Sequence, residues 1–308
     1  ATWKAGNYAE FLSGAARFGT YLETVNSRDM PNADTLHYRI TQDTQISSTL
    51  EAFLSITKKC LKRLKGRKAI LIIDYTDEPF FGKTRNEWVH GYRPAKGSLG
   101  CYKFLAASIL VDDQRYFVYA KPVNEISDES FEILQMLAAV ELMGIKIKVV
   151  LMDRGISRSS ENIAVLTDAG VKYLGLYAKY KNVKKIIRDT KHKYINRKFK
   201  VKGVPTRLVL GKLDIHWTFV TNMDLSELDK YIKLYKKRWN IETGFRVHDE
   251  ARIKTKSTDI RIRYFLFIVA MLLYNVWKYL GSQISFKRFV IRLWMDVECP
   301  CNCRTIPT

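Results

Sequence analysis

Acidic residues are scarce in this chain of 308 residues, which has 31 Asp and Glu against 52 Lys and Arg. The formal net charge is +21, and the isoelectric point is near 9.7. So large an excess of positive charge favours a polyanionic partner, with nucleic acid ahead of an anionic membrane. A basic soluble protein without such a partner is the alternative on charge alone.

Cysteine is also scarce, and its five residues are an odd number. Residues 1–20 mix Lys, Glu and Arg with short apolar runs, so they lack the pattern of a secretory signal. We therefore expect a cytoplasmic protein with free thiols rather than a secreted, disulfide-bonded one. Cys299, Cys301 and Cys303 lie close together, but no second Cys or His cluster completes four zinc ligands. An exposed tail is favoured over a zinc site.

A clear membrane span is missing as well. The apolar run Tyr264–Gly281 is eighteen residues long, whereas a span normally needs about 20. Asn275 and Lys278 interrupt its end. We expect it to form a helix buried against a sheet, and we expect no membrane partner. Hydrophobic residues make up 47% of the chain, enough for the core of one large or two modest domains.

The pattern along the chain predicts three regions. Residues 1–66 are expected to be helical and to bind DNA, because the segment Thr49–Leu64 has a strongly basic far end. A solvated helix face would have the same pattern. Gly66 marks a boundary. Residues 67–281 are expected to form the central domain, and residues 282–308 a basic tail that begins with a short helix.

From Lys68 onward the apolar pattern is that of strands. Ala69–Tyr75 is a continuous apolar run ending in an acid, as expected for a central strand covered on both faces. The next predicted elements are two strands, a helix, a strand, a helix and a strand: Tyr102–Leu110, Arg115–Pro122, Ser127–Met143, Lys146–Asp153, Ser159–Ala169 and Val171–Tyr177. This order is typical of the ribonuclease H-like fold, an α/β fold with a mixed sheet flanked by helices.

Asp74 and Asp153 each lie at the end of an apolar strand, the first and the fourth of this predicted sheet. In this topology the two strands are neighbours and run parallel. They meet at the switch point, where the order of the strands reverses, and open α/β sheets place their functional sites there. The two carboxylates are therefore expected side by side.

A third carboxylate is predicted on one amphipathic helix, Leu228–Arg246. Its buried stripe is expected to contain Leu234, Ile241 and Phe245. Tyr235, Arg238 and Glu242 are spaced by three and four residues, so they lie along one side of that helix. Taken alone, an Arg–Glu pair at this spacing is more simply a solvated face. The two upstream aspartates favour a functional site.

Three such carboxylates could bind metal ions. Two from adjacent strand ends and one from a helix can hold two divalent cations roughly 3.5–4 Å apart. Oxygen ligands select hard ions, so we expect Mg²⁺, for which Mn²⁺ can substitute. Asp74, Asp153 and Glu242 are therefore the candidate catalytic residues and metal ligands. Tyr235 and Arg238 are expected to contact the phosphate backbone of DNA.

Residues 179–223 are predicted to form a basic, β-rich insertion. Lys179–Lys202 contains eleven Lys or Arg and one acid, and a β-hairpin is expected around Gly211, from Thr206–Gly211 and Asp214–Thr221. So many like charges would repel one another without a polyanion, although a solvated loop is the alternative. The further candidate DNA contacts are Lys184, Lys185, Lys198, Lys200 and Arg246.

In these residues the chain resembles the DDE transposases of prokaryotic insertion sequences, in the group marked by the signature Tyr-x2-Arg-x3-Glu-x6-Lys. Tyr235, Arg238 and Glu242 stand at the spacing of that signature, and Asp74 and Asp153 resemble the first two acids of the family. The resemblance covers roughly residues 68–280. It implies cut-and-paste movement of DNA, recognition of terminal repeats and target DNA, a homodimer in the synaptic complex, and Mg²⁺.

The chain departs from the signature at its Lys position, which is occupied by Asp249. Arg246 or Lys254 could substitute. Asp77 and Glu78 are spare acids near the first, but Asp74 is preferred because it directly ends the apolar strand. Two other functions remain open: a DNA-binding protein that has lost catalysis, and a structure-specific nuclease of the same fold. In each case the protein would act on DNA of the nucleoid in a prokaryotic cytoplasm.

Overall fold

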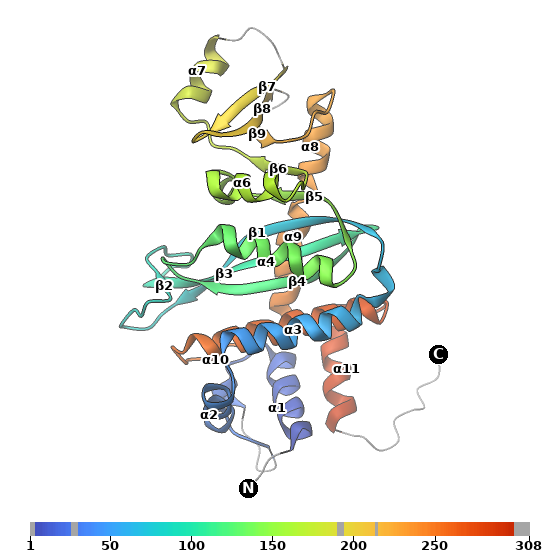
Figure 1. The fold of residues 1–308 in the computed structure, drawn as a ribbon. Helices are drawn as coiled ribbons and strands as arrows, with labels where there is room; N and C mark the ends of the chain where they lie inside the picture. The colour runs from blue at the N-terminus through green and yellow to red at the C-terminus, as the bar shows by residue number, and fades with distance from the viewer. Residues whose placement is uncertain (1–3, 26–29, 190–193, 213–214, 299–308) are drawn as a thin grey trace.

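The computed structural model describes residues 4–25, 30–189, 194–212 and 215–298. A sheet lies in the middle of the molecule between helices (Figure 1). The first and last helices, α1 (Ala5–Phe18) and α11 (Phe286–Glu298), lie together at one end, and the last three strands lie at the other (Figure 1). The cysteine tail predicted near the C-terminus is outside the described residues, whereas Cys60 and Cys101 are buried free thiols.

The sheet contains nine strands within the described residues. They are β1 (Lys68–Phe80), β2 (Val89–His90), β3 (Gly100–Val111), β4 (Gln114–Val123), β5 (Lys146–Met152), β6 (Tyr173–Leu176), β7 (Tyr194–Val201), β8 (Val204–Lys212) and β9 (His216–Thr221). Their order is β2-β3-β1-β5-β6-β9-β8-β7, with β4 paired to β3. β1, β3 and β4 are antiparallel neighbours, whereas β5 and β6 run parallel to β1. The predicted ribonuclease H-like strand order is confirmed.

The remaining elements are helices. The N-terminal ones after α1 are η1 (Leu22–Thr24), α2 (Ala33–Asp43), α3 (Ile46–Cys60) and η2 (Lys62–Leu64). Between the strands lie α4 (Glu129–Leu142), α5 (Arg154–Ser157), α6 (Ser160–Asp168) and α7 (Lys181–Asp189). The last group before α11 is α8 (Leu228–Lys236), α9 (Trp239–His248), η3 (Asp249–Ala251) and α10 (Ile260–Tyr279).

The central strand β1 is buried on both faces because its side chains alternate between two apolar layers. Ile70 and Ile72 belong to a core that includes residues of α3, α9 and α10. Leu71 and Ile73 belong to a second core, which includes residues of α4 and α6. The sheet is therefore sandwiched between helices, and the run of apolar residues in β1 follows from this double coverage.

The apolar run near residue 270 forms α10, which packs against α3 and β4. By length and composition this helix could cross a membrane, but 61% of its apolar stretch is buried inside the protein. Asn275 is buried within it because its amide donates to the carbonyl of Phe117 at 2.7 Å and accepts from the Phe117 N–H at 2.9 Å. A buried polar side chain with both partners costs little. The predicted buried helix is confirmed.

The insertion differs from its prediction in two ways. First, Lys181–Asp189 forms the helix α7, because Val183 and Ile186–Ile187 place an apolar face at helical spacing among the lysines. Second, Gly211 pairs with Trp217 inside the β8–β9 ladder rather than forming the turn, which falls outside the described residues. A Cβ at Gly211 would lie 2.2 Å from Leu228, so this glycine permits a close approach of α8.

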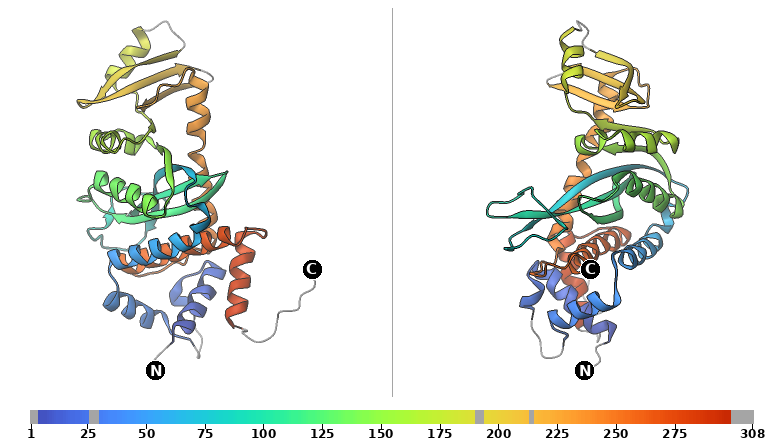
Figure 2. Two further views of the ribbon diagram at one scale, coloured as in Figure 1. Left: turned by 45° about the vertical axis from the view of Figure 1, so that its right-hand side comes forward. Right: turned by 60° about the vertical axis from the view of Figure 1, so that its left-hand side comes forward.

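The insertion also extends the main sheet, since β9 pairs with β6. Similarly, α11 packs against α1, so much of the predicted basic tail is a packed helix. The segment Leu228–Arg246 forms two helices rather than the single one predicted. The N–H groups of Lys237 and Arg238 bond to carbonyls three residues back, which tightens the backbone between α8 and α9. The two helices still lie end to end (Figure 2).

Candidate active site

Asp74 lies on β1, where the parallel part of the sheet ends. β1 continues as far as Phe80, but its parallel neighbour β5 stops at Met152, which pairs with Ile73. The strand is longer than predicted because it continues in the antiparallel ladder with β3. The Asp74 side chain is 12% exposed, and its Oδ1 accepts a hydrogen bond from the Tyr75 N–H at 2.9 Å.

Asp153 follows β5 directly and caps the short helix α5. Its Oδ1 accepts a hydrogen bond from the N–H of Ile156 at 2.9 Å. Because Ile73 and Met152 are partners in the β1–β5 ladder, Asp74 and Asp153 follow at adjacent positions on neighbouring strands. This is the adjacency that the strand order predicted.

Arg238 links the third acid to the first. Its Nη1 donates to Oδ2 of Asp74, and its Nη2 donates to Oε1 of Glu242 at 2.7 Å. The side chain of Arg238 is 11% exposed, whereas that of Glu242 is 56% exposed. Side chains from β1 and α9 therefore meet at one guanidinium, and Asp153 at the end of β5 follows beside Asp74. We call Asp74, Asp153, Glu242 and Arg238 the acid cluster.

The acid cluster has more negative than positive charge, because it contains three carboxylates and one arginine. Burial raises the pKa of Asp74 to about 6, although Arg238 opposes this shift. Asp153 and Glu242 raise the same pKa further, so both lie within electrostatic reach of Asp74. The negative charge of the cluster is therefore only partly balanced by Arg238.

The predicted metal ligands have the right chemistry but do not form a ready-made site. Within the described ranges, no three acidic, His or Cys side chains are close enough to hold a metal ion. Arg238 explains this, since it lies between Asp74 and Glu242 and occupies one oxygen of each. The carboxylate oxygens nevertheless suit a hard divalent cation, which would neutralise the excess negative charge around Asp74.

Tyr235 is buried rather than exposed to a phosphate. Its ring is 2% exposed and packs against Trp217 and Phe219, with centroid distances of 6.3 and 5.3 Å. The carbon of the Arg238 guanidinium lies 5.6 Å from the centroid of the Tyr235 ring. Burial raises the pKa of the Tyr235 hydroxyl to about 12, and this hydroxyl makes no well-aligned hydrogen bond to a described residue. In this conformation Tyr235 supports Arg238.

The predicted DNA-contacting cations on the insertion are exposed. Lys198 pairs with Arg207 in the β7–β8 ladder, so their side chains share one face, and Lys200 lies two residues along it. Val209 on this face belongs to the same core as Ile72 of β1. Lys198 and Lys200 therefore lie on the same face of the sheet as Asp74. The other predicted contacts, also exposed, are Lys184 and Lys185 on α7 and Arg246 on α9.

A fourth carboxylate, Glu129, lies beside the acid cluster and was not predicted as a site residue. It accepts hydrogen bonds from the hydroxyl of Tyr75 and the amide of Asn162. Burial raises its pKa, and Asp153 contributes to the same shift. In the sequence, Glu129 is indistinguishable from an ordinary acid in the first turn of a helix, a turn that Asp128 caps. Its burial depends on the fold.

At the Lys position of the signature, Asp249 accepts a hydrogen bond from Nη1 of Arg252 at 3.3 Å. Arg252 also donates to Glu78 at 3.0 Å, and Arg263 donates to the other oxygen of Glu78. We call Glu78, Arg252 and Arg263 the Glu78 cluster. Asp249 therefore orients an arginine instead of supplying a cation. The two predicted substitutes, Arg246 and Lys254, are both exposed.

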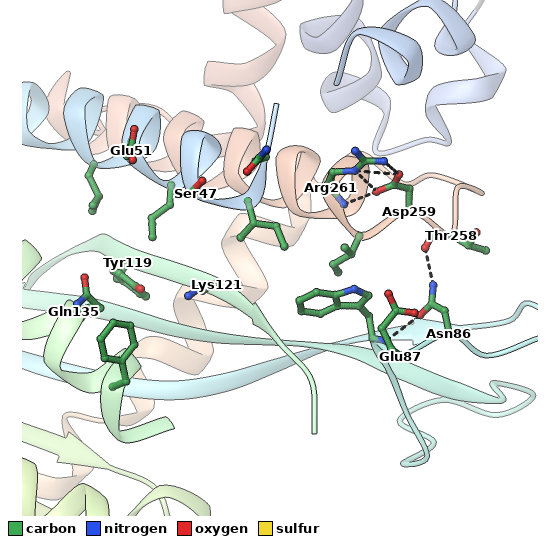
Figure 3. A pocket seen from close by; sticks show the side chains of 17 residues that line it. Ser47, Glu51, Asn86, Glu87, Tyr119, Lys121, Gln135, Thr258, Asp259 and Arg261 are labelled. Carbon is green, nitrogen blue, oxygen red and sulfur yellow. Dashed lines mark hydrogen bonds and ion pairs between the residues drawn. The ribbon is translucent and has the colours of Figure 1, made fainter. Parts of the chain in front are cut away.

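A large cavity of about 1060 Å³ lies away from the acid cluster, between α3, α4 and the start of α10 (Figure 3). Its cations are already paired: Arg261 with Asp259 at 2.6 Å, and Lys121 with Glu132 at 2.6 Å. It therefore offers little free charge to a polyanion. The acid cluster remains the candidate for chemistry on DNA.

Comparison with known families matches residues 65–276 to the family described as "Transposase DDE domain". Among solved structures, a piggyBac transposase synaptic complex with hairpin DNA matches over 99% of this chain and 75% of that chain, with 10% identity and a TM-score of 0.59. A strand transfer complex of the Drosophila P element transposase has 11% identity, coverage of 99% and 93%, and a TM-score of 0.31. The Mos1 strand transfer complex has 10% identity, coverage of 82% and 70%, and a TM-score of 0.21. A search of curated proteins found no match.

At 10% identity, the likeness to the piggyBac transposase shows a shared fold. The family match extends over most of the chain, from the residues before β1 into α10, and includes Asp74, Asp153 and Glu242. The chain therefore belongs to the transposase DDE domain family and is a DDE-type DNA transposase.

Proposed function

We propose that this protein is the transposase of an insertion sequence, which binds the ends of its element and catalyses DNA strand cleavage and strand transfer. The observation that supports this most directly is the convergence on Arg238, which bonds Asp74 and Glu242 while Asp153 raises the pKa of Asp74. Three acids at one place, with too little positive charge to balance them, favour metal-dependent phosphoryl transfer.

Asp74, Asp153 and Glu242 would be the catalytic carboxylates and would hold two Mg²⁺ ions, for which Mn²⁺ can substitute. When bound, these ions would supply the charge that activates a water or 3′-hydroxyl and stabilises the departing 3′-oxygen. Arg238 would bind the phosphate beside the carboxylates, because a guanidinium binds phosphate oxygens as it binds two carboxylates here. Tyr235 would keep that guanidinium in place.

DNA would approach along the face of the sheet that carries Asp74. Lys198 and Lys200 lie on this face, and the exposed cations of α7, Lys184 and Lys185, belong to the same insertion. Such cations position the DNA backbone without reading its sequence. We propose the terminal repeats and the target DNA as substrates. A homodimer would hold two element ends together, at the nucleoid in the cytoplasm.

The test uses purified protein and DNA that carries the element ends. We expect Mg²⁺-dependent cleavage, and Asp74→Asn, Asp153→Asn and Glu242→Gln should each reduce it by at least about a thousandfold while DNA binding persists. The neighbouring acid Asp77, which lies outside the acid cluster, provides the matched control, since Asp77→Asn should retain cleavage. Full activity of any one of the three variants would remove that residue from the site.

Strand transfer is tested separately from cleavage. Pre-cleaved element ends should be joined to target DNA by the wild-type protein, whereas a nuclease of the same fold would cleave DNA without joining ends. A DNA-binding protein without catalysis would do neither at any metal concentration. Analytical ultracentrifugation with end-containing DNA should show two protein chains per synaptic complex.

A further inference from the structure

A cavity of about 440 Å³ lies beside the Glu78 cluster, within the range of roughly 300–1,000 Å³ that is usual for small-ligand sites. Three parts of the chain form its walls: Tyr21, the end of β1 with the turn after it, and the segment from Arg252 to Arg263. The parallel bridge between Tyr21 and Lys254 fixes the first part to the third.

The lining of this cavity has an excess of positive charge. Glu78 is shared by Arg252 and Arg263, and the Nε of Arg263, whose side chain is 7% exposed, is buried without a partner among the described residues. Lys254 and Lys256 also line the cavity, are exposed, and form no ion pair within the part of the chain that the structure describes. Asp249 pairs with Arg252 from outside the lining, so four cations face two carboxylates, and this excess suits an anionic ligand.

Exposed aromatic side chains line the same cavity. Phe81 is 60% exposed and Tyr21 is 39% exposed, although both are large and apolar. Beneath them the turn is tightly packed, since a Cβ at Gly82 would lie 2.4 Å from the ring of Phe80. Aromatic rings beside cations are the combination that binds single-stranded nucleic acid, because the rings stack on bases and the cations bind phosphates.

We propose that this cavity binds one unstacked nucleotide of a DNA strand, with its base against Phe81 and Tyr21 and its phosphate at Lys254 and Lys256. The proposal rests on the proposed function in one respect: the bound DNA strand is the one that the acid cluster cleaves or joins. Asp74 and Glu78 are four residues apart on the same face of β1, or about 13 Å along the strand. B-form DNA advances about 3.4 Å per nucleotide, so the nucleotide would lie about four positions from the reacting phosphate.

Photo-crosslinking of the full chain tests this proposal. A single-stranded oligonucleotide that contains 5-bromodeoxyuridine is irradiated with the protein, and the cross-linked peptides are identified by mass spectrometry. We expect cross-links at Tyr21 or Phe81. Phe81→Ala should reduce their yield about tenfold, since stacking contributes roughly a 5- to 150-fold effect per base. Phe81→Trp should retain them.

The charge of the pocket is tested in the same assay. The double variant Lys254→Ala, Lys256→Ala should lower the yield several-fold. Lys146→Ala provides the matched control, because Lys146 is an exposed lysine at the opposite end of β5 from Asp153, and this variant should leave the yield unchanged. Thermal unfolding of each variant checks that the fold is intact, as expected for side chains that are largely exposed.

Three outcomes would overturn the proposal: cross-links confined to β7 and β8, an undiminished yield with Phe81→Ala, or equal cross-linking of a duplex with the same base. Metal-dependent cleavage by the wild-type protein is measured in parallel. Cleavage without cross-links at the cavity rejects the nucleotide site alone. Cross-links without cleavage reject the proposed chemistry and support the nucleotide site.

Discussion

The two ion clusters on β1 have opposite balances of charge. The acid cluster has three carboxylates and the single Arg238, which pairs with Asp74 and Glu242, whereas in the Glu78 cluster one carboxylate pairs with Arg252 and Arg263. Both lie on the same face of one strand and use the same types of side chain. The acid cluster needs a further cation to be balanced. The Glu78 cluster has one carboxylate and two arginines, and both arginines line a cavity.

The acid cluster therefore suits catalysis and the Glu78 cluster suits stabilisation of the fold, although Asp74 and Glu78 are only four residues apart on β1. An acid cluster that is short of positive charge destabilises the folded protein until a cation binds, which is common at catalytic sites. A half-buried carboxylate with two arginine partners instead ties β1 to the segment before α10 and to α10 itself. The following predictions test this division, from the largest expected effect to the smallest.

The Glu78 cluster should be the more costly of the two to break. Glu78→Gln leaves the buried Arg263 without a counter-charge and Arg252 with Asp249 alone, so we expect a loss of about 3–5 kcal/mol in the free energy of unfolding. Glu242→Gln is the matched change at the acid cluster and should cost less than about 1 kcal/mol, because that side chain is 56% exposed. Urea denaturation measures both. Similar losses for the two variants would remove the distinction.

Removing the buried acid of the acid cluster should stabilise the protein above pH 6. The pKa of Asp74 is raised from 3.8 to about 6, so the folded state retains a proton that the unfolded state loses between these values, and stability falls as the pH rises through this window. Asp74→Asn removes this cost, which is at most about 3 kcal/mol at pH 8. The gain should disappear below about pH 4.

Unfolding of Asp74→Asn at pH 8 and at pH 4 measures this effect. The control is Asp168→Asn, because Asp168 is an exposed acid at the end of α6. That variant should show no such dependence on pH. A gain for Asp74→Asn that persists unchanged at pH 4 would contradict the assigned cause.

A divalent cation should stabilise the acid cluster and leave the Glu78 cluster unchanged. At a Mg²⁺ concentration tenfold above its Kd, the free energy of unfolding should rise by about 1.4 kcal/mol. The increase should be lost in Asp153→Asn and retained in Lys256→Ala, next to the Glu78 cluster. Thermal shift with and without Mg²⁺ measures it. An equal rise in Asp153→Asn would place the ion elsewhere.

The smallest effect on stability is expected at the exposed cations of the insertion. Lys198→Ala combined with Lys200→Ala should change the free energy of unfolding by no more than about 0.5 kcal/mol. The slope of the logarithm of DNA affinity against the logarithm of salt concentration should nevertheless become shallower by about two, since each lysine neutralises one phosphate. Fluorescence anisotropy at several salt concentrations measures the slope. An unchanged slope would place the DNA elsewhere.

The strand order around β1 could be predicted because it depends on local patterns. An apolar run that ends in Asp74 and another that ends before Asp153 indicate buried parallel strands, and topology makes them neighbours. The spacing of Arg238 and Glu242 likewise predicted that they share a helix face. These inferences need only periodicity and the rules that connect strands.

Other features depend on contacts that sequence patterns do not contain. The pairing of Glu78 with Arg252 joins residues 174 positions apart, and nothing near either residue indicates it. The sequence around Gly211 predicts a turn, whereas the structure needs a glycine there because Leu228 of α8 lies against it. Glu129 lies in the first turn of α4, and its contacts with Tyr75 and Asn162 come from other elements. Each of these depends on which elements pack together.

The strand order has a consequence for solubility. β7 ends the sheet, so one of its edges has no partner strand among the described residues. An open edge of this kind can recruit strands from other molecules and start aggregation, and lysines along it oppose that by repulsion. Arg197, Lys198 and Lys200 would therefore keep the free protein monodisperse before it meets DNA. Variants that neutralise all three are expected to precipitate although they remain folded.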